Sequence, residues 1–341
     1  MQSKTFTHYL GLDVSKKTID ACLFDGQQVL NQCQCNNTSA DLRRMISKLL
    51  NAYGLGPEHL LICAEYTGMY IYPLTEACTG MELALWLQHP AELKHSNGVQ
   101  RGKNDVTDAR RIAYYAHRFA DKVRLYIPCE PSIKQLQYLD MERELMVTDR
   151  AKYMAQLKDQ KDFMPVEIYK AKSKRFKRLI KQLDKAILEL EQNMDKLIKQ
   201  DTTLTKQYEQ VTSIDGVGKQ VAIQMLITTK GFTTFTNARK FCCHAGVAPF
   251  AYLSGTSQRS RWRVSHRANK RLKWLFHMAA LSAIRIPGEL QAYFLRKVAE
   301  GKNKMTVINA IRAKLIHRIF AVIKNNTIYE KNYLKISLEK P

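Results

Sequence analysis

The chain has 341 residues, and its 54 lysine and arginine side chains outnumber its 31 aspartate and glutamate side chains, so its formal net charge is +23. A chain of this length buries a large core, and the length suggests two domains with a connecting element. So large a positive charge indicates a polyanionic partner, with nucleic acid as the first candidate and an anionic membrane surface as the second. No apolar run approaches the roughly eighteen residues of a transmembrane helix, which argues against a membrane protein.

The first 120 residues alternate between strand and helix patterns. Short apolar runs predict strands over residues 9–14, 18–24, 28–35, 60–65 and 83–87, and amphipathic patterns predict helices from 39, over 69–78 and over 104–119. Three antiparallel strands followed by alternating helices and strands is the order of a ribonuclease-H-like α/β domain. Two of the predicted strands end in an acidic residue, Asp13 and Glu65.

Two further acids, Asp105 and Asp108, are three residues apart in a predicted helix and therefore share one face. In a ribonuclease-H-like sheet the first and fourth strands are neighbours, so we expect Asp13 to lie beside Glu65. Four converging carboxylates repel one another unless divalent cations bind them, and two such cations can hold the attacking and leaving oxygens of a phosphodiester. For Asp105 or Asp108 alone, an acid favoured by the helix dipole is the simpler explanation.

Residues 132–210 form long, highly charged helix patterns. A heptad-like seam indicates a coiled coil and comprises Phe176, Ile180, Leu183, Ile187, Leu190, Met194 and Leu197. The segment 162–166 contains Pro165 and interrupts the pattern, so we expect an antiparallel helical hairpin. We interpret it as a spacer or an oligomerisation arm, with a basic face that can also touch nucleic acid.

The segment 211–222 has the pattern of a helix-hairpin-helix, with the turn Ile214-Asp215-Gly216-Val217-Gly218 before Lys219. In that motif glycines let backbone N–H groups approach a phosphate at the start of the second helix. An ordinary turn between two core helices is the alternative.

The residues between Asp215 and Glu289 include no acid and many lysines and arginines, which is typical of a surface that contacts a phosphate backbone. Trp274 also lies there; packing is the expected role, and base stacking is the alternative. The predicted nucleic-acid contacts are Gly216, Gly218, Lys219, Arg259, Arg261, Arg263, Arg267, Lys270 and Arg271.

Several longer motifs give the chain a recognisable pattern. They are GLDVSKKTID, AEYTG, KNDVTDARRIA, SIDGVGKQVA, FTNARKFCCHAGVAPFAYLSGTSQRSR and SHRANKRLKWLFHMAA. With these motifs the chain resembles the DEDD transposases, insertion-sequence recombinases that are related to Piv DNA invertases and are now known as bridge-RNA-guided recombinases. The resemblance extends over residues 7–325.

The resemblance implies specific chemistry. Asp13, Glu65, Asp105 and Asp108 match the RuvC-like metal site of the family, which implies bound Mg²⁺ or Mn²⁺. Ser254 matches the family's nucleophile, which forms a covalent serine–DNA link. Leu253 replaces the usual first serine and Thr256 the usual second glycine, so Ser257 stays the alternative nucleophile.

The resemblance also implies partners. They are donor and target DNA, a noncoding guide (bridge) RNA, and further copies of the chain that form dimers and then a tetramer. The place of action would be the bacterial cytoplasm at the nucleoid, and the eight cysteines, which include no CxxC pair, are typical of free thiols in a reducing compartment.

The expected organisation is a RuvC-like domain over 1–130, a coiled-coil linker over 131–210, and a mostly α-helical domain over 211–341 with the helix-hairpin-helix and the serine. The expected function is a transposase or site-specific DNA recombinase of a mobile insertion sequence. One alternative is a metal-dependent RuvC-like junction resolvase or nuclease, which forms no covalent intermediate. Another is a nucleic-acid-binding protein without enzyme activity.

Overall fold

The computed structural model describes residues 6–96, 105–250, 253–254, 258–259, 263–265 and 268–331. The chain divides into two compact units, residues 1–128 and residues 129–341. Each unit has its own hydrophobic core. The proposed division into three domains at residues 130 and 210 stays a prediction.

The first unit is built on one five-stranded sheet with the strand order β3-β2-β1-β4-β5. The strands are β1 (His8–Val14), β2 (Thr18–Phe24), β3 (Val29–Asn36), β4 (Leu60–Glu65) and β5 (Ala84–Gln88). β1, β2 and β3 pair antiparallel, whereas β4 is parallel to both β1 and β5. This is the ribonuclease-H-like topology that the element order predicts, with β1 and β4 as neighbours.

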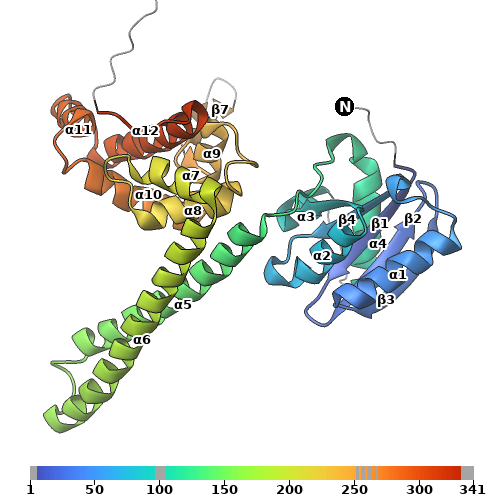
Figure 1. The fold of residues 1–341 in the computed structure, drawn as a ribbon, viewed down its shortest axis with the longest axis horizontal. Helices are drawn as coiled ribbons and strands as arrows, with labels where there is room; N and C mark the ends of the chain where they lie inside the picture. The colour runs from blue at the N-terminus through green and yellow to red at the C-terminus, as the bar shows by residue number, and fades with distance from the viewer. Residues whose placement is uncertain are drawn as a thin grey trace, which may run out of the picture. The chain divides into compact units, whose positions relative to one another are not determined.

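Helices cover both faces of this sheet (Figure 1). α1 (Ser39–Ala52) and α2 (Tyr72–Gly80) pack on the face to which Leu10 and Leu12 contribute. α4 (Asp105–Arg118) packs on the opposite face, against Tyr9 and its neighbours on the other strands. Strand side chains alternate between the two faces, so near-continuous apolar strands supply both cores. A short helix that the sequence patterns did not predict, α3 (Pro90–Ser96), follows β5.

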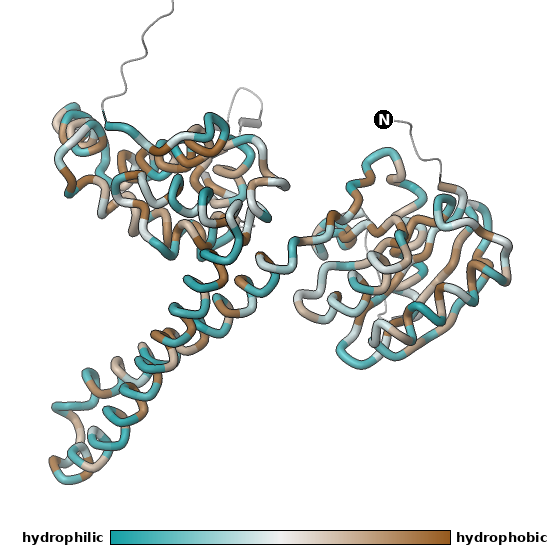
Figure 2. Tube along the Cα trace, in the orientation of Figure 1, coloured by the Kyte–Doolittle hydropathy of each residue, from teal (hydrophilic) through white to brown (hydrophobic). Residues whose placement is uncertain are grey.

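The second unit begins with an antiparallel hairpin of two long helices, α5 (Pro131–Asp159) and α6 (Val166–Gln200), as predicted. Arg143 pairs with Glu191 at 2.7 Å, and further out Arg150 pairs with Asp184. At the base of the hairpin apolar side chains are buried, whereas the outer half of the seam is only partly covered. Apolar and polar residues alternate along both helices (Figure 2).

The rest of the second unit is mostly α-helical, as predicted. Its helices are α7 (Thr202–Thr212), α8 (Lys219–Thr229), α9 (Ala238–His244), α10 (Lys270–Ala283), α11 (Glu289–Ala299) and α12 (Lys304–Asn325). Between α9 and α10 lie the short strands β6 (Pro249–Phe250), β7 (Leu253–Ser254), β8 (Gln258–Arg259) and β9 (Arg263–Val264). The core gathers around Phe241, Phe276 and Ile311, which are fully buried.

All eight cysteines are free thiols, and four of them are buried. Among the helices in the described ranges, none is long and apolar enough to cross a membrane.

Candidate active site and nucleic-acid interface

Asp13 and Glu65 lie next to each other at the carboxyl ends of β1 and β4. The two strands are parallel, and the last paired positions are Leu12 and Ala64, directly before the two acids. Because side chains alternate along a strand, Asp13 and Glu65 point to the face opposite Leu12 and Ala64, which is the face covered by α4. Both acids are partly exposed. The sheet therefore positions two carboxylates side by side at an accessible edge.

The direction of α4 brings the other two acids to the same edge. The ring of His117, near the C-terminal end of α4, lies 5.0 Å from the ring of Tyr9. Two residues further along β1, Gly11 contacts the backbone of Ala109 and Ala113. The helix therefore runs antiparallel to β1, and its first turns lie at the end of the strand where Asp13 stands.

The N-terminal turns of α4 carry Asp105 and Asp108. The Asp108 carboxylate pairs with Arg111 at 2.6 Å, and Asp108 and Arg111 are both about three-quarters buried. Asp105 is the first residue of α4, and its side chain lies outside the described residues. Among the side chains that are described, no three His, Cys, Asp or Glu form a group able to hold a metal ion.

The donor set nevertheless fits a hard divalent cation. The strand ends and the start of α4 provide carboxylates, which are the oxygen ligands that Mg²⁺ and Mn²⁺ prefer. Arg111 pairs with Asp108, so a metal ion that bound Asp108 would share or replace that contact. The residues that would hold the ion are Asp13, Glu65, Asp105 and Asp108.

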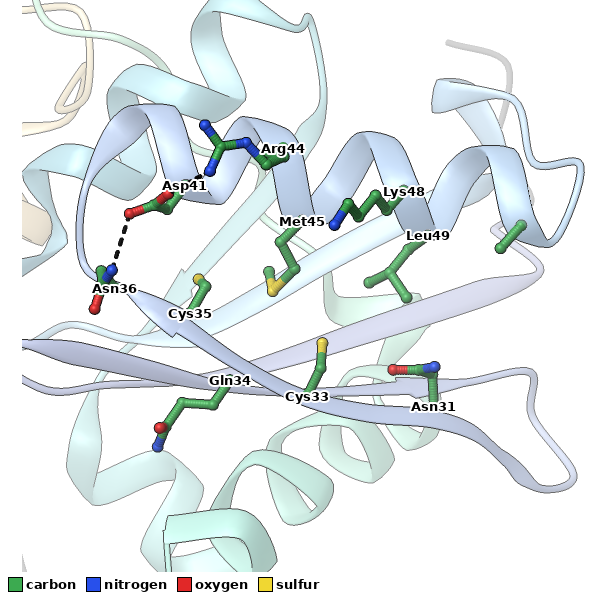
Figure 3. A pocket seen from close by; sticks show the side chains of 11 residues that line it. Asn31, Cys33, Gln34, Cys35, Asn36, Asp41, Arg44, Met45, Lys48 and Leu49 are labelled. Carbon is green, nitrogen blue, oxygen red and sulfur yellow. Dashed lines mark hydrogen bonds and ion pairs between the residues drawn. The ribbon is translucent and has the colours of Figure 1, made fainter.

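A pocket of about 460 Å³ in this unit lies elsewhere, between the edge strand β3 and α1 (Figure 3). Cys33 and Cys35 point from β3 toward α1, whereas Gln34 points away. The acid among its lining residues, Asp41, is held by Asn36 and Arg44. α1 covers the sheet face opposite α4, so this pocket is not part of the carboxylate edge.

Ser254 lies in a short hairpin between α9 and α10. It ends β7 and pairs with Gln258 of β8 in an antiparallel pair of strands. The side chains of Ser254, Arg259 and Arg263 lie outside the described residues, as do Ser257, Arg261 and Arg267 entirely. The structure thus gives the backbone position of the predicted nucleophile within the second unit.

The predicted helix-hairpin-helix consists of α7, a turn and α8. Gly216 in the turn has φ +85°, and a Cβ atom there would lie 2.6 Å from Cβ of Ala283 in α10. Glycine at this position is therefore required by packing against α10. Gly218 is different, because it precedes α8 with φ −93° and a Cβ atom would meet nothing within 4 Å. The open side of Gly218 leaves room for a ligand.

Two of the predicted phosphate contacts are paired inside the second unit. Lys219 forms an ion pair with Asp195 of α6. Arg271 contacts Asp140 at 2.8 Å and Glu144 at 2.6 Å, both in α5. Arg271 therefore fixes α10 to the hairpin, a role that sequence reasoning missed because the partner lies far away along the chain. Lys270, one residue earlier, is exposed.

Trp274 does not pack as expected. Its side chain is 60% exposed, one turn beyond Lys270 on α10. Its environment therefore leaves the base-stacking alternative open.

A ribonuclease-H-like sheet with acids at the ends of β1 and β4 and at the start of α4 is typical of enzymes that cut and join nucleic acid strands. The comparison with known families specifies the class further. A transposase family model matches residues 10–165, and the model of the IS116/IS110/IS902 transposase family matches residues 208–295. The chain belongs to this transposase family, whose members are DNA-cutting and DNA-rejoining enzymes.

Two relatives align over nearly the whole chain, and a third over about half of it. The pilin gene-inverting proteins of Moraxella lacunata and Moraxella bovis are each 24% identical over 328 residues, which is 95% of this chain and 98% of theirs. The insertion element IS116 uncharacterized 44.8 kDa protein of Streptomyces clavuligerus is 24% identical over 159 residues, 46% of this chain and 40% of that protein. Among solved structures, Thermus thermophilus RuvC in complex with a Holliday junction substrate matches with a TM-score of 0.28 and 9% identity, over 35% of this chain and 99% of that one.

Proposed function

We propose that this chain is the transposase, or site-specific recombinase, of a mobile insertion sequence and that it uses Ser254 and the four carboxylates together. The role of the carboxylates is supported by one observation: Asp13, Glu65 and the start of α4 lie at the same edge of the sheet. The relatives named for inverting a pilin gene support rejoining of DNA strands, since inversion requires every cut end to be joined again. This argues for recombination over a nuclease that leaves hydrolysed ends.

In the proposed reaction the Ser254 hydroxyl attacks a DNA phosphorus, and a phosphoserine ester forms as the bond to one deoxyribose oxygen breaks. The serine proton leaves to a base or solvent, and the departing deoxyribose oxygen takes up a proton. A deoxyribose hydroxyl from another strand then attacks the phosphoserine, which releases Ser254 and joins the strands. Arg259, Arg261 and Arg263 follow Ser254 closely in sequence and would stabilise negative charge on the phosphate.

A divalent cation at Asp13, Glu65, Asp105 and Asp108 would supply charge neutralisation for phosphate oxygens when bound. The carboxylates themselves hold their positions through the pairing of β1 with β4 and through the contact of α4 with Gly11. We propose Mg²⁺ or Mn²⁺ as the ion because the donor set is all oxygen.

The proposed partners are donor DNA, target DNA and a noncoding guide RNA. A net charge of +23 supports a protein that holds several polyanionic strands. Exposed leucines along the α5–α6 hairpin support assembly into dimers and then a tetramer, because another copy would cover Leu145, Leu179 and Leu188. A DNA-acting enzyme of this family would work at the nucleoid of a bacterial cytoplasm.

The test is recombination between a donor and a target plasmid with the RNA encoded beside the gene supplied. We expect recombinant junctions and a denaturation-resistant protein–DNA adduct with the wild-type chain. Ser254→Ala should abolish both, and Asp105→Ala should abolish recombination. The matched control is Ser257→Ala, which should retain activity. Full activity of Ser254→Ala would overturn the nucleophile assignment, and hydrolysed ends without an adduct would favour a nuclease.

A further inference from the structure

Three large side chains stand exposed directly after Glu65. Tyr66 is 48% exposed, Met69 is 55% exposed and Tyr70 is 39% exposed. Tyr66 follows Glu65, the last residue of β4, and Met69 and Tyr70 lie in the short 3-10 helix η2 (Gly68–Ile71), at most five residues beyond the strand. Exposed apolar side chains that lie close together often mark a binding site.

The backbone that carries these side chains is fixed to the same edge as the carboxylates. The Tyr66 N–H donates to the carbonyl of Gln88, at the end of β5, at 2.9 Å. The Asn37 side-chain amide donates to the Tyr70 carbonyl at 2.9 Å and to the Ser15 carbonyl, two residues after Asp13, at 2.8 Å. The segment 66–70 is therefore tied to the ends of both β1 and β5.

Packing decides which side chains of η2 face outward. Ile71 is 2% exposed and anchors the short helix in the core, and this leaves Met69 and Tyr70 on the outer side. Gly68 has φ +68°, a conformation that favours glycine, and a Cβ atom there would meet nothing within 4 Å. The loop is thus rigid at its base and open on its outer surface.

Two buried polar atoms of this loop region lack a partner among the described residues: Oγ1 of Thr67 and Oδ1 of Asn37. Buried polar atoms ordinarily have a hydrogen-bond partner, from the protein or from ordered water. Thr67 lies two residues after Glu65, so a water molecule or a bound ligand at this end of β4 would supply such a partner.

We propose that Tyr66, Met69 and Tyr70 form a stacking platform for an unpaired nucleobase of the DNA strand next to the phosphodiester being cut. Every base has a π-face, so aromatic side chains bind unpaired bases with little sequence preference, worth about 1–3 kcal/mol for each stacked base. A paired base cannot stack on a side chain without leaving the duplex. The platform therefore selects DNA that is locally opened beside the carboxylates, and this inference rests on the proposed function.

The chain offers a matched control for the platform. Tyr114 is also exposed, at 40%, and stands on α4, with the Arg110 guanidinium 5.7 Å from its ring. It lies more than two turns beyond Asp105, toward the far end of the helix from the carboxylates. Loss of Tyr114 removes a tyrosine of similar exposure without touching the platform.

The experiment measures binding of the full-length chain to two DNA duplexes, in Ca²⁺ or EDTA so that cleavage does not occur. One duplex is fully paired; the other contains a short bubble with 2-aminopurine at an unpaired position. We expect the wild-type chain to prefer the bubble and to quench the 2-aminopurine fluorescence. Tyr66→Ala and Tyr70→Ala should each weaken bubble binding about tenfold and restore the fluorescence, as expected for about 1.4 kcal/mol of lost stacking.

The same variants should change binding of the paired duplex less than about twofold, and Tyr66→Phe, Tyr70→Phe and Tyr114→Ala should behave as wild type. Equal bubble binding by wild type and both alanine variants would overturn the platform, as would loss of quenching in the phenylalanine variants. A wild-type chain that fails to recombine plasmids but shows the tyrosine-dependent bubble preference refutes the proposed function and leaves the platform standing. Recombination that proceeds unchanged in Tyr66→Ala and Tyr70→Ala refutes the platform alone.

Discussion

Gly11 of β1 lies so close to Ala109 of α4 that a Cβ atom on the glycine would be 2.3 Å from the Ala109 carbonyl oxygen. The helix can approach the strand this closely only because Gly11 has no side chain. Because this approach fixes where the start of α4 lies relative to Asp13, Gly11 connects the packing of the first unit with its carboxylate edge.

We expect Gly11→Ala to lower the free energy of unfolding of the first unit by about 1–3 kcal/mol, as is usual for overpacking in a tight core. It should also weaken divalent-cation binding, because α4 must shift away from β1. Urea denaturation followed by circular dichroism, together with a Mn²⁺ titration, measures both effects. An unchanged denaturation midpoint and unchanged metal affinity would show that the contact is not important.

The two glycines of the predicted helix-hairpin-helix should respond differently to alanine. Gly216→Ala should destabilise the second unit by about 1–3 kcal/mol, because φ +85° strains a side chain and its Cβ atom meets Ala283. Gly218→Ala should change stability by less than about 1 kcal/mol, since its surroundings are open. If the backbone at Gly218 contacts a phosphate, this variant should still weaken DNA binding several-fold in fluorescence anisotropy. Wild-type affinity of a well-folded Gly218→Ala protein would rule out that contact.

Asp140 is a buried carboxylate that joins three helices of the second unit. Its side chain is 1% exposed and accepts hydrogen bonds from Arg271 of α10 and Gln224 of α8. Burial raises the pKa of Asp140, and the charge of Arg271 opposes that rise. Asp140→Ala removes the main partner of Arg271, so we expect a loss of about 2–4 kcal/mol in denaturant unfolding. Glu144→Gln removes the more exposed partner and should cost less than about 1 kcal/mol.

His277 makes the stability of the second unit depend on pH. Burial, and then the charge of Arg312 at 2.6 Å, lower the pKa of His277. Below its ordinary pKa of about 6.5 the unfolded chain therefore binds a proton that the folded unit does not, so stability is present above that pH and is lost as pH falls. We expect the urea midpoint of the second unit to decrease between pH 8 and pH 5.5. His277→Gln should flatten this dependence, and an unaltered slope in that variant would assign it to other groups.

Binding of Mg²⁺ or Mn²⁺ should stabilise the first unit. At a concentration ten times the dissociation constant, the gain is about 1.4 kcal/mol and should raise the melting temperature in calorimetry. Asp108→Asn and Glu65→Gln should remove this response, and EDTA should reverse it in the wild-type chain. Asp41→Asn is a suitable control, because Asp41 belongs to the pocket on the other face of the sheet. A metal response that survives Glu65→Gln would place the ion elsewhere.

Local patterns in the sequence were sufficient for most elements of the first unit and for the helical hairpin of the second. Apolar runs that end in an acid predicted β1 and β4 with Asp13 and Glu65 at their ends, and the heptad spacing with a break at Pro165 predicted the α5–α6 hairpin. These features follow from side-chain periodicity, which each segment carries by itself. The strand ends and the helix pattern indicated the four acids, which the family resemblance matched, whereas Ser254 came from the resemblance alone; the roles of all five stay predictions.

Contacts between distant segments were decided by the tertiary structure alone. The sequence predicted that the arginines and lysines between residues 215 and 289 form one basic surface. In the structure, however, Arg271 pairs with Asp140, which is 131 residues away along the chain. A glycine in a turn motif suggested a phosphate contact, yet Gly216 is needed for α10 to pack. Trp274 was expected inside and is exposed, and the exposure of Tyr66 and Tyr70 had no sequence signal. The packing of the whole unit decides which charged side chains pair and which aromatic side chains are buried. The sequence by itself determines only which helix or strand each segment can form.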